Sequence, residues 1–303
     1  MTSALRRLFS DRAARVALGV LAILFVAALV GVLILGNGAT QFGVVMLKNN
    51  PPSLAHPFGT DQYSRDVLTR VLFGAGISLT VAILSVFCSV TIGTAYGIVA
   101  GFYGGRVDSF MMRLLDGFLS IPRVLLLIAV LVVAAPVRLP GLILLIGATG
   151  WFGVSRLVRA ETLVAKRLEY VDAARALGTS DARIIWRHLL PNVAAPVIVT
   201  ATLAVGNVIS LEAGLSYLGI GAREPTPSWG SIFYDGVTYF AGNWWVAFFP
   251  GIAIVITVLA FNVLGDALRD VLDPRHLHPV GSEPALVPST TSSSSANDRL
   301  PNG

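Results

Sequence analysis

The sequence is poor in charge, cysteine and recognisable catalytic motifs. Only 13% of its 303 residues are Asp, Glu, Lys or Arg, whereas a soluble globular domain carries about 25%. Its one cysteine, Cys88, rules out a disulfide within the chain and lies in an apolar run, where a buried small side chain is the favoured interpretation. The sequence has no GxxxxGK[ST] phosphate loop, no HExxH motif and no paired-cysteine pattern. We therefore expect a chain that is not an enzyme and that binds no cofactor and no metal itself.

Long apolar segments take up most of the chain, and 54% of the residues are hydrophobic. A membrane helix needs about 20 mostly apolar residues. Six segments meet this requirement, and they predict an all-α, polytopic membrane protein with six transmembrane helices: Val16–Gly36, Ile77–Ala100, Gly117–Ala135, Leu139–Ser155, Val193–Ser216 and Trp245–Leu268. The first segment is too long for the apolar core of a signal peptide and lacks a clear cleavage site, so we interpret it as a retained span.

Basic residues are distributed unevenly between the two sides of these spans. With the N-terminus inside, 16 of the 22 Lys and Arg residues fall on the inner side and Arg123 fits neither side; five fall on the outer side, namely Lys48, Arg65, Arg70, Arg138 and Arg223. The positive-inside rule then places both termini in the cytoplasm. The predicted organisation is a cytoplasmic segment 1–15, a six-span domain 16–273 with an inner loop at about 156–192, and a tail 274–303. The tail has few large apolar residues, and we expect it to be disordered.

The inner loop contains a strongly polar stretch, EYVDAARALGTSDARIIWRHLLPN (169–192). The pattern predicts an amphipathic helix over Thr162–Leu177, with Leu163, Val171, Ala174 and Leu177 near one face. Gly178 follows where a left-handed C-cap is expected. Thr179 or Ser180 can then cap a second helix over Asp181–Leu190, and Pro191 marks its boundary with the next span. The loop therefore reads as a helical hairpin, either a plain surface feature or a docking element for a cytoplasmic partner.

The hairpin sequence resembles the EAA loop of ABC importer permeases, whose pattern is Glu-Ala-Ala, three residues, Gly, and a Leu-Pro pair further on. Here Asp172-Ala173-Ala174, Gly178 and Leu190-Pro191 match it, with Asp in place of the usual Glu. Three further stretches, 56–79, 215–233 and 249–275, resemble the C-type permease of dipeptide and oligopeptide importers, a family that includes nickel and glutathione systems. Ser64, Gly76 and Arg123 depart from its usual pattern.

The resemblance implies a function and a set of partners. The chain would form half of a translocation pathway for di- or oligopeptides in a bacterial inner membrane, with a homologous B-type permease as the other half. An extracytoplasmic binding protein would deliver the peptide. Two cytoplasmic ATPases, which would bind ATP and magnesium, would receive the hairpin through the six motif residues named above. No nucleic acid is expected as a partner.

Polar residues within the spans are candidates for the pathway, because exposure of such groups to hydrocarbon is costly. Arg123, Asn207 and Glu212 are the residues that we select, with pairing to a neighbour as the alternative for Glu212. Arg123 follows Pro122, which should kink or break the helix there; it can pair with Asp116 only if the backbone stays helical. Gly93 and Gly97 form a GxxxG pattern that indicates close helix packing.

Other classes of function stay open at this point. Nickel or glutathione are alternatives to peptide as the substrate. An ion-coupled secondary transporter would show inverted repeats and broken midplane helices, and we find no convincing pair in the sequence. A membrane scaffold without transport activity is the third class.

Overall fold

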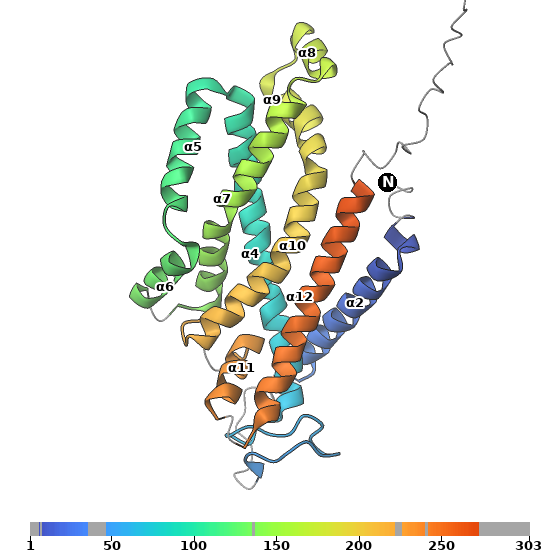
Figure 1. Ribbon diagram of the computed structural model, residues 1–303, viewed down its shortest axis with the longest axis vertical. Helices are drawn as coiled ribbons and strands as arrows, with labels where there is room; N and C mark the ends of the chain where they lie inside the picture. Colours follow the sequence, from blue (N-terminus) through green and yellow to red (C-terminus); the bar gives the residue numbers. More distant parts are fainter. Residues whose placement is uncertain are drawn as a thin grey trace, which may run out of the picture. The chain divides into compact units, whose positions relative to one another are not determined.

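The computed structural model describes residue 6 and residues 8–35, 47–134, 137–221, 226–239 and 242–272. Apart from one isolated bridge between Thr60 and Asp66, the regular structure of this described part is helical (Figure 1). The helices are α2 (Arg12–Leu33), α4 (Val67–Tyr103), α5 (Gly105–Leu119), α6 (Arg123–Val133), α7 (Leu139–Ala165), α8 (Glu169–Ala176), α9 (Asp181–Ile184), the π-helical turn η2 (Ile185–Leu189), α10 (Leu190–Tyr217), α11 (Trp229–Thr238) and α12 (Trp244–Leu272). The predicted disordered tail, 274–303, lies outside the described residues.

Within the described residues, five helices are long and apolar enough to cross a membrane: α2, α4, α7, the continuous stretch Asp181–Tyr217, and α12. The pair α5 and α6 passes the same test together but is bent by 72°. The all-α prediction with six spans is confirmed if this pair counts as one broken span. The break expected at Pro122 is confirmed, because the chain leaves the helix at Ser120 and restarts at Arg123; the bounds Gly117–Ala135 are too narrow, since α5 already begins at Gly105.

Two spans extend well beyond the apolar segments that predicted them. α4 starts ten residues before Ile77, where the side chain of Asp66 caps the helix by accepting a hydrogen bond from the Thr69 amide at 2.8 Å. α7 continues ten residues past Ser155, although Arg156 and Arg159 interrupt the hydropathy there. Both arginines pair with carboxylates of α5, so their charges do not end the helix.

The core forms around α4, which packs most extensively on α7 and also contacts α2, α10 and α11. Gly93, Gly97 and Gly101 line the α4–α7 contact. A Cβ at Gly97 would lie 2.6 Å from the carbonyl oxygen of Ser155, and one at Gly93 would lie 2.7 Å from Cβ of Val154. The close packing predicted from the GxxxG pattern is therefore confirmed, and it extends one turn further to Gly101.

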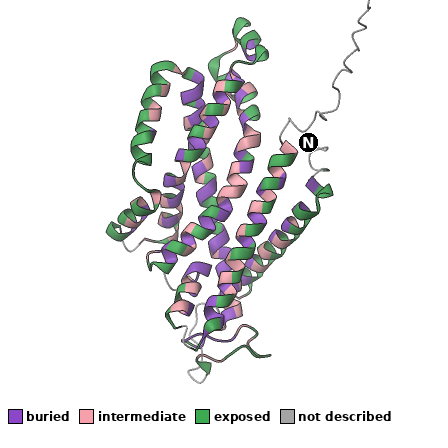
Figure 2. Cartoon of the chain, viewed as in Figure 1, coloured by how far each residue is buried: buried purple, intermediate pink, exposed green. Residues whose placement is uncertain are grey.

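The two ends of the helix bundle differ in character. α8 and α9 lie at one end, which we call the hairpin end; α11 and the segment 47–66 lie at the other, which we call the α11 end (Figure 1). α5 stands at the side of the bundle, and Leu115 is its one buried residue, so most of this helix is exposed (Figure 2).

Candidate functional site

The hairpin at residues 166–192 is packed onto the end of α4. Val171 and Ala174 of α8 are buried against Phe102 of α4, together with Ile184 and Leu189. The guanidinium carbon of Arg175 lies 5.5 Å from the centre of the Phe102 ring, a cation–π distance. The hairpin is thus fixed to the bundle by its own small hydrophobic core.

A lysine at the base of the hairpin closes the C-terminus of α4. The Lys166 ammonium donates a hydrogen bond to the carbonyl oxygen of Gly101 at 2.7 Å and lies 3.5 Å from that of Phe102. These carbonyls lack partners within the helix, and a cation there also complements the helix dipole. The chain turns at Lys166–Leu168 to make this contact. The prediction of one helix over Thr162–Leu177 is therefore wrong: Thr162 belongs to the end of α7, and α8 begins at Glu169.

The turn between α8 and α9 has the predicted chemistry. Gly178 has a positive φ of 74°. Its amide donates to the carbonyl oxygen of Arg175 at 2.9 Å, and the Thr179 amide donates to that of Ala174 at 3.0 Å. These two bonds define a Schellman motif, in which a residue without a Cβ is favoured at the left-handed position. The predicted left-handed C-cap is confirmed.

The second arm of the hairpin differs from its prediction. α9 begins at Asp181 as expected, with Ser180 at the N-cap position, but the Ser180 side chain makes no capping hydrogen bond. The helix does not stop at Leu190. It passes through the π-helical turn η2 and continues as α10, with Pro191 in the first turn of α10. Proline is tolerated there because the turn before it has already widened and the Pro191 nitrogen needs no helical partner.

The hairpin presents an exposed edge that combines polar and apolar groups. Asp172 and Ala173 are exposed. Leu177 is 85% exposed and Trp186 72% exposed. Leu177 therefore does not share the buried face predicted for it. Of the other motif residues, Ala174 is buried, Gly178 and Pro191 are exposed, and Leu190 is partly buried.

The base of the hairpin is held by a side-chain contact that spans its two arms. The Asn192 amide donates to the Tyr170 hydroxyl at 2.6 Å and to the carbonyl oxygen of His188 at 2.5 Å. The Tyr170 and His188 rings lie 5.7 Å apart. α8 is in this way tied to the first turn of α10, and the two arms form one body.

The three pathway candidates lie in different environments. Arg123 is partly buried at the start of α6 and donates to the carbonyl oxygen of Ile146 at 2.8 Å and to the Thr149 hydroxyl at 3.3 Å. Because the backbone breaks at Pro122, Arg123 does not reach Asp116. Asn207 is exposed on α10 and makes no hydrogen bond with the residues that the structure describes.

Glu212 is buried near the α11 end and 1% exposed. Its carboxylate accepts hydrogen bonds from the hydroxyls of Ser216 at 2.7 Å, Ser228 at 2.8 Å and Ser78 at 3.4 Å. Pairing with neighbours, the alternative considered for this residue, is what the structure shows. Asn207 lies five positions earlier on the same helix and so points about 140° away.

Two ion pairs that join α5 to α7 could not be anticipated from the sequence. Arg159 pairs with Asp108, and Arg156 pairs with Asp116. The partners are 51 and 40 positions apart, and no local spacing rule connects such residues. These ion pairs hold α5 to α7, together with the stacking of Phe118 on Phe152.

A second unanticipated cluster lies at the α11 end. The Asp61 carboxylate, fully buried, accepts hydrogen bonds from the guanidinium groups of Arg65 and Arg70, each at 2.7 Å. Asp235 of α11 lies 3.1 Å from Arg70 and 3.5 Å from Arg65. The indole of Trp245 donates to the Thr60 carbonyl oxygen at 3.0 Å and that of Trp229 to Val71 at 2.9 Å. The segment 47–66, α4, α11 and α12 are thereby joined.

The described residues contain no group of three or more His, Cys, Asp or Glu side chains placed to hold a metal ion. The features at hand are instead those of a multi-pass helical membrane protein with a broken span and a helical hairpin fixed at one end. A model of the family described as "binding-protein-dependent transport system inner membrane component" matches residues 93–278. The chain belongs to this family, and its membrane-spanning helices agree with that assignment.

The chain matches several named proteins over most of its length. It is 43% identical over 270 residues to a putative peptide transport system permease protein of Brucella abortus, covering 89% of this chain and 90% of that one. It is 42% identical to the dipeptide transport system permease protein DppC of Bacillus subtilis, covering 89% and 84%. A glutathione transport system permease protein, GsiD of Pectobacterium atrosepticum, is 40% identical and covers 75% of each chain.

The fold also matches a solved structure. A chain of the MetNI methionine ABC transporter, in an inward-facing conformation, superposes with a TM-score of 0.55 at 21% identity, covering 67% of this chain and 96% of that one. At this identity the match establishes the fold, that of an ABC transporter permease.

Proposed function

We propose that this chain is one of two permease subunits of an ATP-driven importer that carries di- or oligopeptides into the cell. The family membership and the 42–43% identity to relatives named as peptide permeases support the substrate class. The single structural observation that carries the coupling role is the hairpin, which is rigidly packed on its inner side and exposes Leu177 and Trp186 on its outer side.

An exposed apolar edge on a fixed element suits a protein partner. A large apolar group that stays in water loses the free energy that burial provides, about 25 cal/mol per Å². A hairpin held by Phe102, Lys166 and Asn192 cannot turn these groups inward. In the proposed assembly, Leu177, Trp186 and the edge at Asp172-Ala173 contact a surface cleft of a cytoplasmic ATPase. The ATPases, and not this chain, bind ATP and magnesium and perform the hydrolysis.

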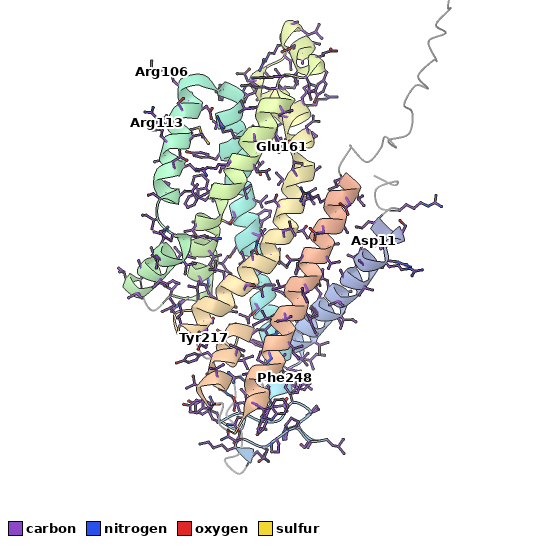
Figure 3. The ribbon with its side chains drawn as sticks, in the orientation of Figure 1. Asp11, Arg106, Arg113, Glu161, Tyr217 and Phe248 are labelled. Atoms are coloured by element: carbon purple, nitrogen blue, oxygen red, sulfur yellow. The ribbon has the colours of Figure 1, made fainter. Side chains whose placement is uncertain are left out.

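The charge distribution supports a cytoplasmic hairpin. Arg106 and Arg113 lie on α5 toward the hairpin end, while Tyr217 and Phe248 lie toward the α11 end (Figure 3). Lys166, Arg167 and Arg175 are at the hairpin end as well. By the positive-inside rule these charges support a cytoplasmic position for this end, and in the proposed assembly a binding protein delivers substrate at the α11 end.

Site-specific cross-linking in membranes tests the hairpin contact. Because Cys88 is the single cysteine, Cys88→Ser gives a cysteine-free background into which Leu177→Cys is introduced. We expect a short thiol–amine cross-linker to join this position to an ATPase subunit that mass spectrometry identifies. Leu54→Cys is the matched control, since Leu54 is fully exposed but lies at the α11 end, and it should give no ATPase adduct.

Uptake measurements test the transport role itself. Deletion of the gene should abolish ATP-dependent uptake of a labelled dipeptide or tripeptide, and the wild-type gene should restore it. Gly178→Arg should not restore uptake, because a side chain at φ 74° is strained and disturbs the hairpin turn. Gly178→Asn, which tolerates this conformation better, should restore part of it. Uptake that persists without the ATPases would instead favour an ion-coupled transporter, and wild-type uptake after deletion a scaffold.

Glutathione is the second candidate substrate, because a relative named as a glutathione permease shares 40% identity over 75% of the chain. Glutathione is itself a small peptide with free carboxylates, so both candidates need the same kind of pathway. Competition of unlabelled glutathione against labelled dipeptide in the uptake assay separates the two.

A further inference from the structure

Arg123, at the break between α5 and α6, carries its charge inside the membrane-spanning region. Arg123 is the first residue of α6, and its guanidinium contacts Ile146 and Thr149 of α7. These residues lie 7 and 10 positions after Leu139, the start of α7, which is roughly 10–15 Å along a helix of about 40 Å. Since the hydrocarbon layer is about 30 Å thick, a depth of roughly 10–15 Å from the start of α7 puts this charge well inside the span.

The surroundings of the guanidinium are built to hold it. The Ile146 carbonyl oxygen and the Thr149 hydroxyl accept its hydrogen bonds at 2.8 and 3.3 Å. Gly150 leaves the necessary room, since a Cβ there would lie 3.1 Å from Nη2 of Arg123 and 2.3 Å from the hydroxyl oxygen of Ser89. Arg123 therefore takes one defined orientation against the contact between α4 and α7.

The acceptors that hold Arg123 are neutral. Arg70, Arg156 and Arg159 each pair with an aspartate, but no carboxylate pairs with Arg123 among the residues that the structure describes. An arginine has five N–H donors; α7 accepts from two nitrogens, and Nη1 has no acceptor in the described part of the chain. The charge and part of its hydrogen-bonding capacity are left for another group.

A charge without a counter-ion is costly inside a membrane and usually faces an aqueous cavity or a ligand. Arginine is suited to a carboxylate, with which it forms two parallel charge-assisted hydrogen bonds. A peptide with a free C-terminus always carries a carboxylate, whatever its side chains. Broken helices near the membrane midplane line the substrate sites of other transporters, and Arg123 lies at such a break.

We propose that Arg123 pairs with the C-terminal carboxylate of the peptide during its passage and thereby selects substrates with a free carboxyl end. This inference rests on the proposed function. Arg123 thus acts as a specificity-determining residue, held in place by Ile146 and Thr149 of α7.

The test compares two substrates in liposomes that contain the complete transporter with its binding protein. One is a labelled tripeptide with a free carboxylate, and the other is the same tripeptide as its C-terminal amide. Arg123→Gln should lower uptake of the free acid by about tenfold or more, the size expected for a lost hydrogen bond to a charged group. The slower uptake of the amide should not change, and Arg123→Lys should be intermediate for the acid. Arg156→Gln is the matched control, because Arg156 already pairs with Asp116, and it should affect both peptides alike.

A labelling experiment tests the position independently of the amide. In the Cys88→Ser background, Arg123→Cys should react with a membrane-impermeant anionic methanethiosulfonate in at least one nucleotide state, and the free-acid peptide should slow the reaction. Equal losses of acid and amide uptake in Arg123→Gln, or no labelling in any state, would overturn the inference while leaving peptide transport intact. A wild-type transporter that carries neither peptide would instead overturn the proposed function.

Discussion

The buried cluster at the α11 end gives a quantitative prediction for Asp61→Asn. One carboxylate oxygen of Asp61 accepts from the amides of Tyr63 and Arg65, both at 2.8 Å, and the other accepts from the side chains of Arg65 and Arg70, both at 2.7 Å. Asparagine can keep the first pair of bonds. In place of the second oxygen it presents an amide group, which is itself a donor and faces two guanidinium groups.

The magnitude follows from the charge balance of the cluster. Asp61 and Asp235 balance Arg65 and Arg70, whose side chains are 4% and 1% exposed. Asp61→Asn leaves one buried positive charge uncompensated, and breaking a buried pair in this way costs about 3–5 kcal/mol. We expect the lower part of that range because Asp235 remains 3.1 Å from Arg70. At about 2–4 °C per kcal/mol for a chain of this size, the midpoint of unfolding should fall by roughly 10 °C.

The assay heats the tagged chain in lipid nanodiscs and measures the fraction that stays soluble. Asp172→Asn is the control, since the Asp172 side chain is 67% exposed and its loss should have little effect. Adding Arg70→Gln to Asp61→Asn restores the charge balance and should recover part of the lost stability. A shift below about 2 °C for Asp61→Asn, or no recovery in the double variant, would refute the reasoning that an uncompensated buried charge causes the loss.

Two further predictions concern packing and the buried carboxylate. Gly97→Ala should destabilise the chain by about 1–3 kcal/mol, because the new Cβ clashes with the Ser155 carbonyl. Gly153→Ala is the control: nothing lies within 4 Å of its new Cβ, so it should be neutral or slightly stabilising. The same heating assay measures both variants, and equal effects would contradict the close α4–α7 contact. Glu212→Gln should change stability by less than about 1 kcal/mol because its amide oxygen can still accept from Ser216 and Ser228, while Glu212→Leu should cost about 3 kcal/mol by leaving hydroxyls unpaired. Normal stability of Glu212→Gln with lost uptake would show that the charge serves transport.

The features that the sequence predicts correctly are those set by local chemistry. Hydropathy identifies the spans because a membrane helix must satisfy its own backbone and expose apolar side chains. Gly178 is predictable because few other residues favour the left-handed position in a helix C-cap. Pro122 likewise indicates the break that separates α5 from α6.

The features that the sequence does not predict depend on residues far apart along the chain. The charges of Arg156 and Arg159 lead hydropathy to end the span at Ser155. The helix α7 nevertheless continues, because α5 supplies counter-ions for both arginines. The sequence leaves open whether Glu212 pairs with a neighbour, and it cannot identify the partners, because Ser78 and Ser228 approach from other parts of the chain. The start of α8 depends on Lys166, which bonds the end of a helix 65 positions away. Such pairings exist only once the helices have assembled.

The continuity of α9, η2 and α10 has a mechanical consequence. Asp181–Tyr217 is one helical rod of 37 residues, about 55 Å long, that begins in the exposed hairpin and ends beside α11. A rod of this length converts a small translation at one end into a tilt about the point where it is most tightly packed. The rod departs from regular α-helix at two points: the η2 turn, where each N–H bonds five residues back instead of four, and Pro196, which removes one hydrogen bond inside α10. Both points lie in the half of the rod nearer the hairpin, so the regular helix beyond Pro196 moves as one lever when the hairpin is displaced.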